Sequence, residues 1–407
     1  MDIVVLKFGG SSVANNINLN IVANKIIQFK QYGKSVIVVV SAQGKTTDNL
    51  IKEAKELSEI PSPRELDALL NVGEQISASK LAILLNKLGY DSISLNGYQA
   101  GIKTTGEFQN AKIIDINIEK IKAELSKNRI VIITGFQGVD EQGNITTLGR
   151  GGSDTSAVAI ASVLKAKKCY IFSDVDGVYT SDPKHVKNAL KLKNISYKEM
   201  KYASNEGAKV LHDRCVELAE KYNLPIIAAS TFSDNEGTKI TKEIQKKKKS
   251  LINNKGIEES EIKSIIKNDN ILLVTINSKE SSRILKEIIR SNIRIGNYQV
   301  YNNSVKFTIM KDNKEKLINL FGRKGYKVNI IEVTKISIVG IGISSNNKIL
   351  NTLVNILTDI KDEISYIDIN ACKISIQFKS VIDNKYLSEI HNNLFKYYNH
   401  KSYLKWI

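Results

Sequence analysis

The chain has 407 residues, of which 42% are hydrophobic, which is enough for two or three domains with cores of their own. It has no run of about 18 uncharged apolar residues, which excludes a membrane-spanning helix. Its three cysteines (Cys169, Cys215, Cys372) are scattered and odd in number, which argues against a disulfide framework or a zinc site. The net charge of +17 is uneven, because residues 1–240 hold 30 Lys and Arg against 26 Asp and Glu, whereas the rest hold 29 against 16.

The first predicted strand is IVVLKF at residues 3–8, and MDIVVLKFGG shows no secretory signal, so we expect a cytoplasmic protein. Segments of helical period, such as residues 18–33, separate the apolar runs that follow. Buried strands that alternate with helices indicate a mostly parallel sheet with helices on both faces, where ligands bind at the carboxyl ends of strands. The other predicted strands are residues 35–42, 91–95, 129–136, 169–175 and 225–230.

A glycine turn, Gly9-Gly10, follows the first strand, and we expect Ser11 or Ser12 to begin a helix there. Such a turn exposes backbone N–H groups to an anion, and Lys7 adds a positive charge beside them. A Gly-Gly pair is also common in ordinary tight turns. The spacing fits neither a P-loop nor a dinucleotide-binding fingerprint, and protein-kinase motifs are missing.

A second glycine turn lies in TLGRGGSD, ahead of an apolar helix. Gly151 and Gly152 expose the backbone, and Ser153 is expected to be the N-cap of the helix. The guanidinium of Arg150 suits a carboxylate or a phosphate. Asp154 has two interpretations, either a residue that favours the helix dipole or an active-site acid.

An acidic segment, SDVDGVYTSDPK, follows the strand at 169–175. It is either a polar turn or a set of groups that bind ribose hydroxyls, the adenine amino group or the water shell of Mg²⁺. Farther on, Lys209 in NEGAKVLH is either a solvated helical lysine or a further positive charge. The polar residues of the segment are Ser173, Asp174, Asp176, Tyr179 and Asp182.

The lysine run QKKKKS at 245–250 predicts a solvated linker. After it come two units of the same order, strand, helix, strand, strand, helix, at residues 271–321 and 335–395. Each is about the size of a ferredoxin-like domain. Neither contains a catalytic constellation, so the pair indicates binding or assembly.

Seven motifs occur in the order and spacing of one family: KFGGSS, VVVSAQGKTTD, RELDALLNVGEQIS, TGFQG, TTLGRGGSDTSA, SDVDGVYTSDP and GAKVLH. Across residues 3–240 the chain resembles the aspartate kinases of the amino-acid-kinase superfamily, and the terminal repeats resemble their ACT domains. The resemblance implies an α/β fold, a mostly parallel sheet sandwiched by helices, followed by two ferredoxin-like βαββαβ ACT domains. It implies a catalytic domain at 1–240, a basic linker at 241–255 and ACT-like domains at 256–333 and 334–407.

The implied reaction converts ATP and L-aspartate to ADP and 4-phospho-L-aspartate, the first step toward lysine, threonine and methionine. Mg²⁺ is the implied cofactor, with no metal ligand assigned. A carboxylate nucleophile is already ionised at neutral pH, so no general base is required. The enzyme must instead overcome the repulsion between this anion and the γ-phosphate, by positioning and by charge stabilisation.

The resemblance also implies roles for individual residues. Lys7 bridges the attacking carboxylate and the phosphoryl group, and Asp154 organises Lys7 and the Mg²⁺–phosphate water shell. Arg150 binds the α-carboxylate of aspartate, and Glu74 its α-ammonium. The ATP-binding residues are Lys7, Phe8, Gly9, Gly10, Ser173, Asp174, Tyr179, Asp182, Lys184, Lys209 and Val210, and the aspartate-binding residues are Ser41, Thr47, Glu74, Arg150, Gly151, Gly152 and Ser153.

The sequence departs from the family toward its C-terminus. Ala229 in AAST stands where the family often has an arginine, SKESSR replaces a Pro-Gly turn in the first repeat, and DINACKIS at 368–375 replaces the effector segment of the second. We therefore expect weak or altered feedback by lysine or threonine. Methionine occurs only at positions 1, 200 and 310, so no internal start lies near the linker. This predicts a single-chain homodimer or homotetramer that associates through the ACT-like repeats, sheet edge to sheet edge.

Three alternatives remain. The first is a related kinase acting on glutamate or acetylglutamate, against which the Glu74 segment and the doubled repeat count. The second is a catalytically silent amino-acid sensor, which the presence of Lys7, Arg150 and Asp154 disfavours. The third is a nucleic-acid binder built on residues 241–407, but the lysines there are spread out, so we expect neither a nucleic-acid nor a membrane partner.

Overall fold

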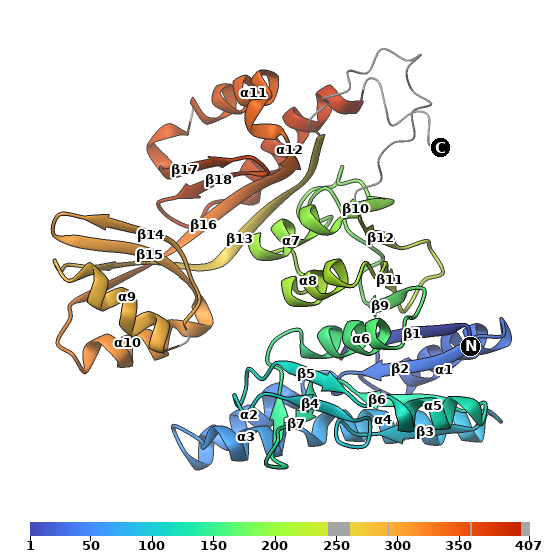
Figure 1. Ribbon diagram of the computed structural model, residues 1–407. Coiled ribbons are helices and arrows are strands. Elements are labelled where there is room, and N and C mark those ends of the chain that lie inside the picture. Colours follow the sequence, from blue (N-terminus) through green and yellow to red (C-terminus); the bar gives the residue numbers. More distant parts are fainter. Residues whose placement is uncertain (243–260, 292, 359, 400–407) are drawn as a thin grey trace. The chain divides into compact units, whose positions relative to one another are not determined.

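The computed structural model describes residues 1–242, 261–291, 293–358 and 360–399. The chain forms two compact units (Figure 1): Met1–Val178 with Lys191–Ile252, and Tyr179–Leu190 with Asn253–Ile407. Most of the predicted linker at 241–255 lies outside the described residues, and the predicted domain boundaries stay predictions. The segment Tyr179–Leu190 is notable because it groups with the C-terminal unit although it follows the fifth predicted strand.

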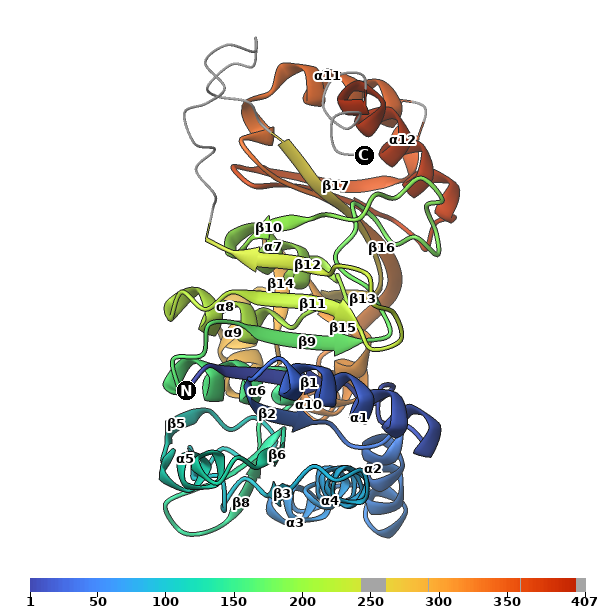
Figure 2. The same ribbon diagram turned by 90° about the vertical axis from the view of Figure 1, so that its right-hand side faces the viewer.

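The first unit is built on an eight-stranded sheet, in the order β10-β12-β11-β9-β1-β2-β6-β3 (Figure 2). Every neighbouring pair is parallel except β11 and β12. The predicted mostly parallel sheet is thus confirmed. The strands are β1 (Ile3–Phe8), β2 (Ser35–Val40), β3 (Ser92–Leu95), β6 (Ile130–Thr134), β9 (Cys169–Ser173), β10 (Asn194–Ser196), β11 (Ile226–Ser230) and β12 (Thr238–Thr241).

Helices cover both faces of this sheet, and strand alternation decides which side chain meets which helix. Leu6 and Phe8 are fully buried in a core shared with α1 (Asn16–Gln31) and α4 (Val72–Lys87). Lys7 lies between them and faces the opposite side, where α6 (Gly152–Val163) packs on β1, β2 and β9. The remaining helices of the unit are α2 (Thr46–Leu57), α3 (Pro63–Leu70), α5 (Glu119–Ser126), α7 (Tyr197–Glu206) and α8 (Asp213–Lys221).

A four-stranded sheet in the order β5-β4-β7-β8 was not predicted. Strands of three or four residues are too short to show a period in the sequence. The last of them leads directly into residues Leu148–Gly152, which we name the arginine loop because Arg150 lies at its centre. These strands are β4 (Ile102–Thr104), β5 (Ile113–Ile116), β7 (Gln137–Val139) and β8 (Ile145–Thr147).

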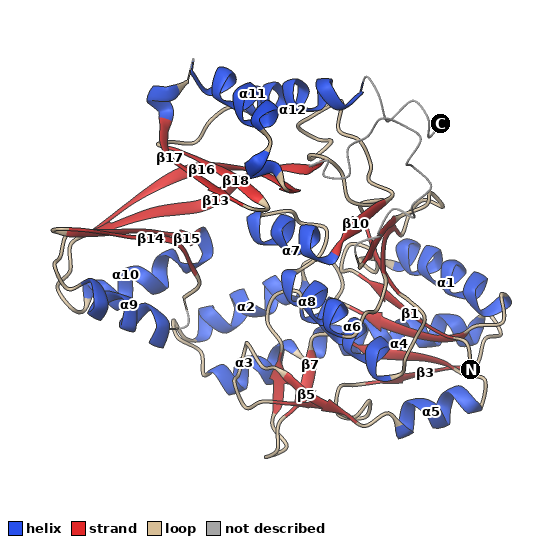
Figure 3. Ribbon diagram, turned by 45° about the horizontal axis from the view of Figure 1, so that its top comes forward, coloured by secondary structure: helices blue, strands red, loops and turns tan. Residues whose placement is uncertain are grey.

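The second unit has one antiparallel six-stranded sheet, β14-β15-β13-β16-β18-β17, with helices packed on it (Figure 3). Two long strands, β13 (Glu261–Ile276) and β16 (Val328–Ile341), run through both repeats. Each supplies the first strand of one βαββαβ repeat and the last strand of the other, which confirms the predicted ferredoxin-like pair. The other elements are β14 (Ile295–Tyr301), β15 (Ser304–Met310), β17 (Ile364–Asn370), β18 (Lys373–Phe378), α9 (Ser281–Arg290), α10 (Lys314–Gly322), α11 (Asn347–Thr358), α12 (Asn384–Asn399), and the 3₁₀ turns Lys311–Asn313, Ile343–Ser345 and Lys361–Glu363.

Within the second unit, α12 binds the segment Tyr179–Leu190. Thr180 Oγ1 lies 2.9 Å from His391 Nε2, and Ser388 Oγ donates to the carbonyl of His185 at 3.1 Å. Asn384 lies one turn before Ser388 on the same helix face and contacts the His185 ring at 3.1 Å. The segment that carries three of the predicted nucleotide-binding residues is therefore anchored on the C-terminal helix.

No helix in the described ranges combines the length and the apolar surface that crossing a membrane requires. The three cysteines are buried free thiols. Burial raises the pKa of the Cys169 and Cys215 thiols, which disfavours the reactive thiolate at neutral pH.

Candidate active site

The carboxyl ends of β9, β1, β2 and β6 meet at one edge of the large sheet. Lys7 is in register with Val39 on β2, and Val39 with Ile133 on β6. One residue beyond the end of β2, the Ser41 N–H donates to the Phe8 carbonyl at 3.1 Å. The motifs KFGGSS, SAQGKTTD and TGFQG therefore emerge side by side, as expected for a parallel sheet.

Lys7 and Asp154 form an ion pair at this edge. Lys7 Nζ lies 2.6 Å from Asp154 Oδ1, and the two side chains are 11% and 13% exposed. The pair forms because Lys7 points to the α6 side of the sheet, where Asp154 occupies the first turn of that helix. A Cβ on Gly9 would lie 3.6 Å from the ammonium, so the charge lies beside the glycine turn. Both interpretations of Asp154 stay open, because it lies in the first turn of α6 and also pairs with Lys7.

Two predicted helix starts are wrong. Helix α6 begins at Gly152, with Gly151 as N-cap in the left-handed region (φ 68°), so Ser153 lies in the first turn and makes no capping hydrogen bond. Helix α1 begins at Asn16, because the Asn15 side chain accepts from the Asn18 N–H at 2.9 Å. An anion at Gly9-Gly10 would therefore be bound by turn amides and by Lys7, without a helix terminus.

The arginine loop fits only glycine at two positions. A Cβ on Gly151 would lie 2.3 Å from the His212 ring, and one on Gly152 would lie 2.8 Å from the Phe136 ring. Both distances are below any real Cβ contact, and Gly151 also has a positive φ, which favours glycine. The loop is thus packed tightly on both sides while Arg150 itself is exposed.

Glu74 has a buried carboxyl group with one unused oxygen. It is 3% exposed, in the first turn of α4, and packs close to β2 because Gly73 approaches Ala42. The Ala42 N–H donates to Oε1 at 3.1 Å, whereas Oε2 has no hydrogen-bond partner among the described residues. Burial raises the pKa of Glu74 to about 8. A buried acceptor left unsatisfied is costly, so this oxygen indicates a site for a cationic group.

The other predicted aspartate-binding residues lie in the same unit. Ser41 directly follows β2, and Thr47 is in the first turn of α2, both half-buried. Gly151, Gly152 and Ser153 belong to the arginine loop and the start of α6.

The predicted nucleotide-binding residues are divided between the two units. Ser173 ends β9, with exposed Asp174 after it, and Lys209 and Val210 lie between α7 and α8. Phe8 stacks on Phe172 in the core at 5.0 Å between ring centroids, so only its backbone faces the edge. Tyr179, Asp182 and Lys184 belong to the second unit.

Two residues near the arginine loop were missed by the sequence analysis, Asp67 on α3 and Arg214 on α8. Asp67 is fully buried and accepts hydrogen bonds from Gln109 and Thr147. Arg214 donates to the backbone carbonyls of Leu148 and Ala111. Asp67 lies in the RELDALL segment, on the same helix face as the apolar Leu70. A charged residue on an apolar helix face was the sequence signal that could have identified it.

A resident metal site is not formed by the described part of the chain, where no three His, Cys, Asp or Glu side chains gather. Asp154 is a single carboxylate at the carboxyl edge. That donor set fits Mg²⁺ of the kind that takes most of its ligands from phosphates and water.

Replacing Glu74 with glutamine is expected to stabilise the unliganded protein at high pH. Between the ordinary pKa near 4.5 and about 8, folded Glu74 keeps a proton that the unfolded chain releases, so the stability of the wild type falls as pH rises across this window. The advantage of Glu74→Gln should grow to a few kcal/mol, roughly, between pH 5 and pH 8. Thermal melts at both pH values measure it.

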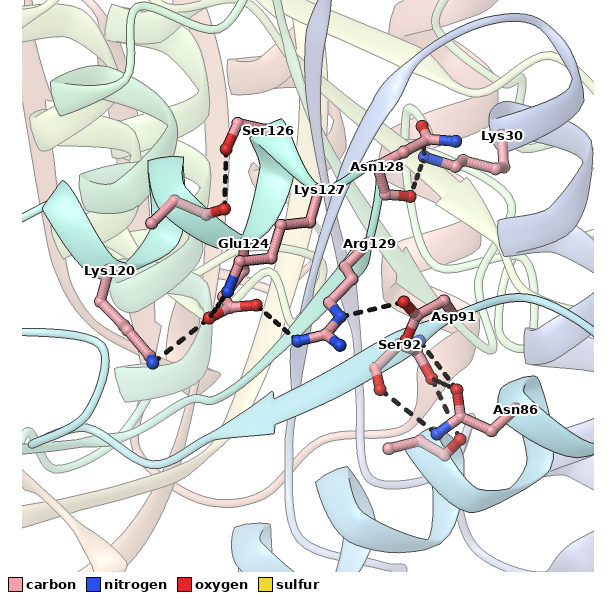
Figure 4. Close-up of polar contacts among 12 residues, drawn as sticks. Lys30, Asn86, Asp91, Ser92, Lys120, Glu124, Ser126, Lys127, Asn128 and Arg129 are labelled. Atoms are coloured by element: carbon pink, nitrogen blue, oxygen red, sulfur yellow. Dashed lines mark hydrogen bonds and ion pairs between the residues drawn. The ribbon is translucent and has the colours of Figure 1, made fainter.

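Glu124→Gln is the matched control for this experiment. Glu124 is also buried, but at the opposite edge of the sheet, where Arg129 lowers its pKa to about 2 (Figure 4). Its replacement should destabilise the protein at both pH values. An unchanged difference between wild type and Glu74→Gln from pH 5 to pH 8 would contradict the raised pKa.

The comparisons with known proteins agree with one another. The family model described as the amino acid kinase family matches residues 2–230. An aspartokinase of Geobacillus stearothermophilus is 42% identical over 393 residues, which cover 95% of each chain. The E. coli aspartokinase III structure with aspartate and ADP has a TM-score of 0.73 at 20% identity, over 97% of this chain and 99% of that one. The same enzyme with lysine and aspartate gives 0.72 at 22% identity, over 97% and 100%. At these identities the structural likeness concerns the fold alone.

Proposed function

The chain belongs to the amino acid kinase family and, within it, to the aspartokinases, and from that premise we propose that it transfers the γ-phosphoryl group of ATP to the β-carboxylate of L-aspartate. The products would be ADP and 4-phospho-L-aspartate. The observation that carries the proposal is the Lys7–Asp154 ion pair at the carboxyl edge, in the same unit as Glu74 and the arginine loop.

Lys7 is proposed to act on the transferring group. The nucleophile is a carboxylate, so the barrier is dominated by repulsion between two anions, which a fixed ammonium between them reduces. Asp154 holds that ammonium at 2.6 Å and so fixes its direction. The Gly10 N–H is proposed to donate to the phosphates, and Gly9, whose own N–H donates to the Phe172 carbonyl at 3.1 Å, is proposed to leave room for them to approach the turn. Mg²⁺ bound with ATP would neutralise part of the phosphate charge.

Aspartate is proposed to be oriented through its α-carboxylate and its α-ammonium group. Arg150 would bind the α-carboxylate through two parallel hydrogen bonds, and the free Oε2 of Glu74 would accept from the α-ammonium. Both contacts would hold the α end of aspartate and would leave its β-carboxylate free to meet the phosphoryl group. The remaining contacts are assigned to Ser41, Thr47, Gly151, Gly152 and Ser153.

ATP is proposed to bind along β9 and the segment that follows it. The residues assigned to ATP are Ser173, Asp174, Tyr179, Asp182, Lys184, Lys209 and Val210.

The test of the proposed function is ATP-dependent acyl-hydroxamate formation with L-aspartate and with L-glutamate. Acyl phosphates react with hydroxylamine, so the product reports the carboxyl acceptor directly. We expect hydroxamate from aspartate and at most a few per cent of that rate from glutamate. A preference for glutamate would instead identify a related carboxylate kinase, and no product from either would favour a catalytically silent sensor.

We further propose a cytoplasmic homo-oligomer, a dimer or tetramer formed through the ACT repeats, that supplies lysine, threonine and methionine synthesis. The aspartokinase relatives and the paired repeats support this. Lysine or threonine are the proposed effectors, since an E. coli aspartokinase III structure contains lysine.

Feedback by these effectors is expected to be weak or altered. The DINACKIS segment forms the β17–β18 hairpin, and the carbonyls of Ala371 and Cys372 accept from Gly342 and Gly340 at 3.1 Å each, so they are already used within the sheet. Isothermal titration should therefore show no tight lysine or threonine binding, and either amino acid should lower turnover less than about twofold near its usual cellular level. Tight lysine binding that abolishes turnover would contradict this.

A further inference from the structure

We propose that Asp67 and Arg214 are positioning residues for aspartate binding, because they fix the backbone from which Arg150 projects. The inference rests on the proposed function, and it adds two residues that do not touch substrate. It is carried by hydrogen bonds from two oppositely charged side chains to adjacent residues, Thr147 and Leu148, just before the arginine loop turns.

Asp67 satisfies three donors at once. Its Oδ2 accepts from the Thr147 N–H at 2.7 Å and the Gln109 N–H at 2.9 Å, and its Oδ1 accepts from Thr147 Oγ1 at 2.7 Å. The side chain is fully buried. A buried ionised carboxylate is tolerated only when its oxygens are well hydrogen-bonded, and such charge-assisted bonds are stronger than neutral ones. Asp67 therefore joins the end of β8 to the β4–β5 connection.

Arg214 is a positively charged donor to backbone carbonyls of the same region. Its Nη1 donates to the Leu148 carbonyl at 2.8 Å and its Nη2 to the Ala111 carbonyl at 2.7 Å. Ala111 in turn donates its N–H to the Thr147 carbonyl at 2.9 Å. The planar guanidinium reaches two carbonyls with one rigid group, which a lysine cannot do.

The two side chains act on successive residues of one short backbone segment. Asp67 binds the N–H of Thr147, and Arg214 binds the carbonyl of Leu148, so the peptide units on both sides of the Thr147–Leu148 bond are fixed. The next residue is Gly149, whose φ of 75° turns the chain, and Arg150 follows it. The chain after Arg150 is held by close packing at Gly151 and Gly152, and the chain before it by Asp67 and Arg214, so the direction of Arg150 depends on both sides.

The charged groups around the buried Glu124, at the opposite edge of the sheet, are arranged differently. There Arg129 Nη1 donates to Glu124 Oε2 at 2.9 Å and Arg129 Nε to Asp91 Oδ2 at 3.0 Å, so charged side chains pair with one another (Figure 4). Asp67 and Arg214 are instead directed at backbone groups around one loop. That difference gives Arg129 the role of matched control: a partly buried arginine with two acceptors, away from the proposed site.

The experiment compares Asp67→Asn, Arg214→Ala, Arg214→Lys and Arg129→Ala by steady-state kinetics. We expect KM for aspartate to rise about 10- to 100-fold in Asp67→Asn and Arg214→Ala, with KM for ATP changed less than about twofold, because a displacement near 1 Å is enough to weaken an oriented contact. Arg214→Lys should fall between wild type and Arg214→Ala. Arg129→Ala should leave the ratio of the two KM values unchanged even where it lowers thermal stability.

Hydrogen exchange provides a readout that does not depend on activity. Peptides that cover residues 147–155 should exchange at least about tenfold faster in Asp67→Asn and Arg214→Ala than in Arg129→Ala. Unchanged exchange there, or faster exchange with an unchanged KM for aspartate, would overturn the inference. If the wild type itself forms no aspartyl hydroxamate, the proposed function fails, and the exchange result still decides whether these residues fix the loop. If Asp67→Asn does not fold, the two variants Arg214→Ala and Arg214→Lys decide the question.

Discussion

Replacing Lys7 with alanine is expected to lower kcat at least about a thousandfold, with KM for aspartate changed less than about threefold. Lys7 is the cation that the structure fixes at the carboxyl edge, with its ammonium 2.6 Å from Asp154. In the proposed mechanism its loss leaves the two reacting anions without a positive charge between them, and it removes the Lys7 partner of Asp154, which is 13% exposed. Initial rates at saturating ATP and aspartate measure the effect.

Lys34→Ala is the matched control. Lys34 also forms an ion pair with an aspartate at 2.6 Å, with Asp2, but it lies beside the amino end of β2. Its removal should leave kcat unchanged within experimental error. A Lys7→Ala variant that kept its kcat and only bound ATP more weakly would show that Lys7 holds nucleotide without acting on the transferring group.

Replacing Arg150 with alanine is expected to raise KM for aspartate about a hundredfold while kcat falls less than about tenfold. Arg150 is exposed at the centre of a loop whose glycines pack tightly against His212 and Phe136. Its loss is expected to act mainly on substrate binding. Steady-state kinetics against aspartate and ATP, together with a thermal melt, measure the two effects separately.

Arg64→Ala serves as the control for this variant, because Arg64 is an exposed arginine on α3 that pairs with Glu65 on the surface. Surface pairs of that kind contribute little to stability, so the variant should match the wild type. An Arg150→Ala variant with an unchanged KM for aspartate would remove the α-carboxylate assignment, and the arginine loop would need another role.

The large sheet and the meeting of its motifs could be predicted from sequence because the signals are local. The runs around Val5, Val38 and Ile132 are continuously apolar, as buried parallel strands require, and parallel strands bring their carboxyl ends to one edge. Glu74 could be predicted only from the family resemblance, since a helical acid shows nothing in sequence of the burial that raises its pKa.

Other features depend on contacts that sequence patterns do not show. The predicted strand at residues 271–276 is the second half of β13, whose first half, Glu261–Asn268, was missed because KNDN interrupts the apolar alternation at a register shift. Ser153 was mistaken for the cap of α6 because the left-handed Gly151 caps the helix two residues earlier than the side-chain preference indicates. Asp67 and Arg214 bind backbone groups far along the chain, which no local pattern records.

The most direct measurement of the central proposal is a crystal structure with a non-hydrolysable ATP analogue and L-aspartate bound together. We expect Lys7 Nζ within hydrogen-bonding distance of both the γ-phosphate and the β-carboxylate, with Arg150 and Glu74 on the far end of aspartate. Ligands bound away from the carboxyl ends of β1, β2 and β9, or an aspartate whose β-carboxylate points away from Lys7, would contradict it.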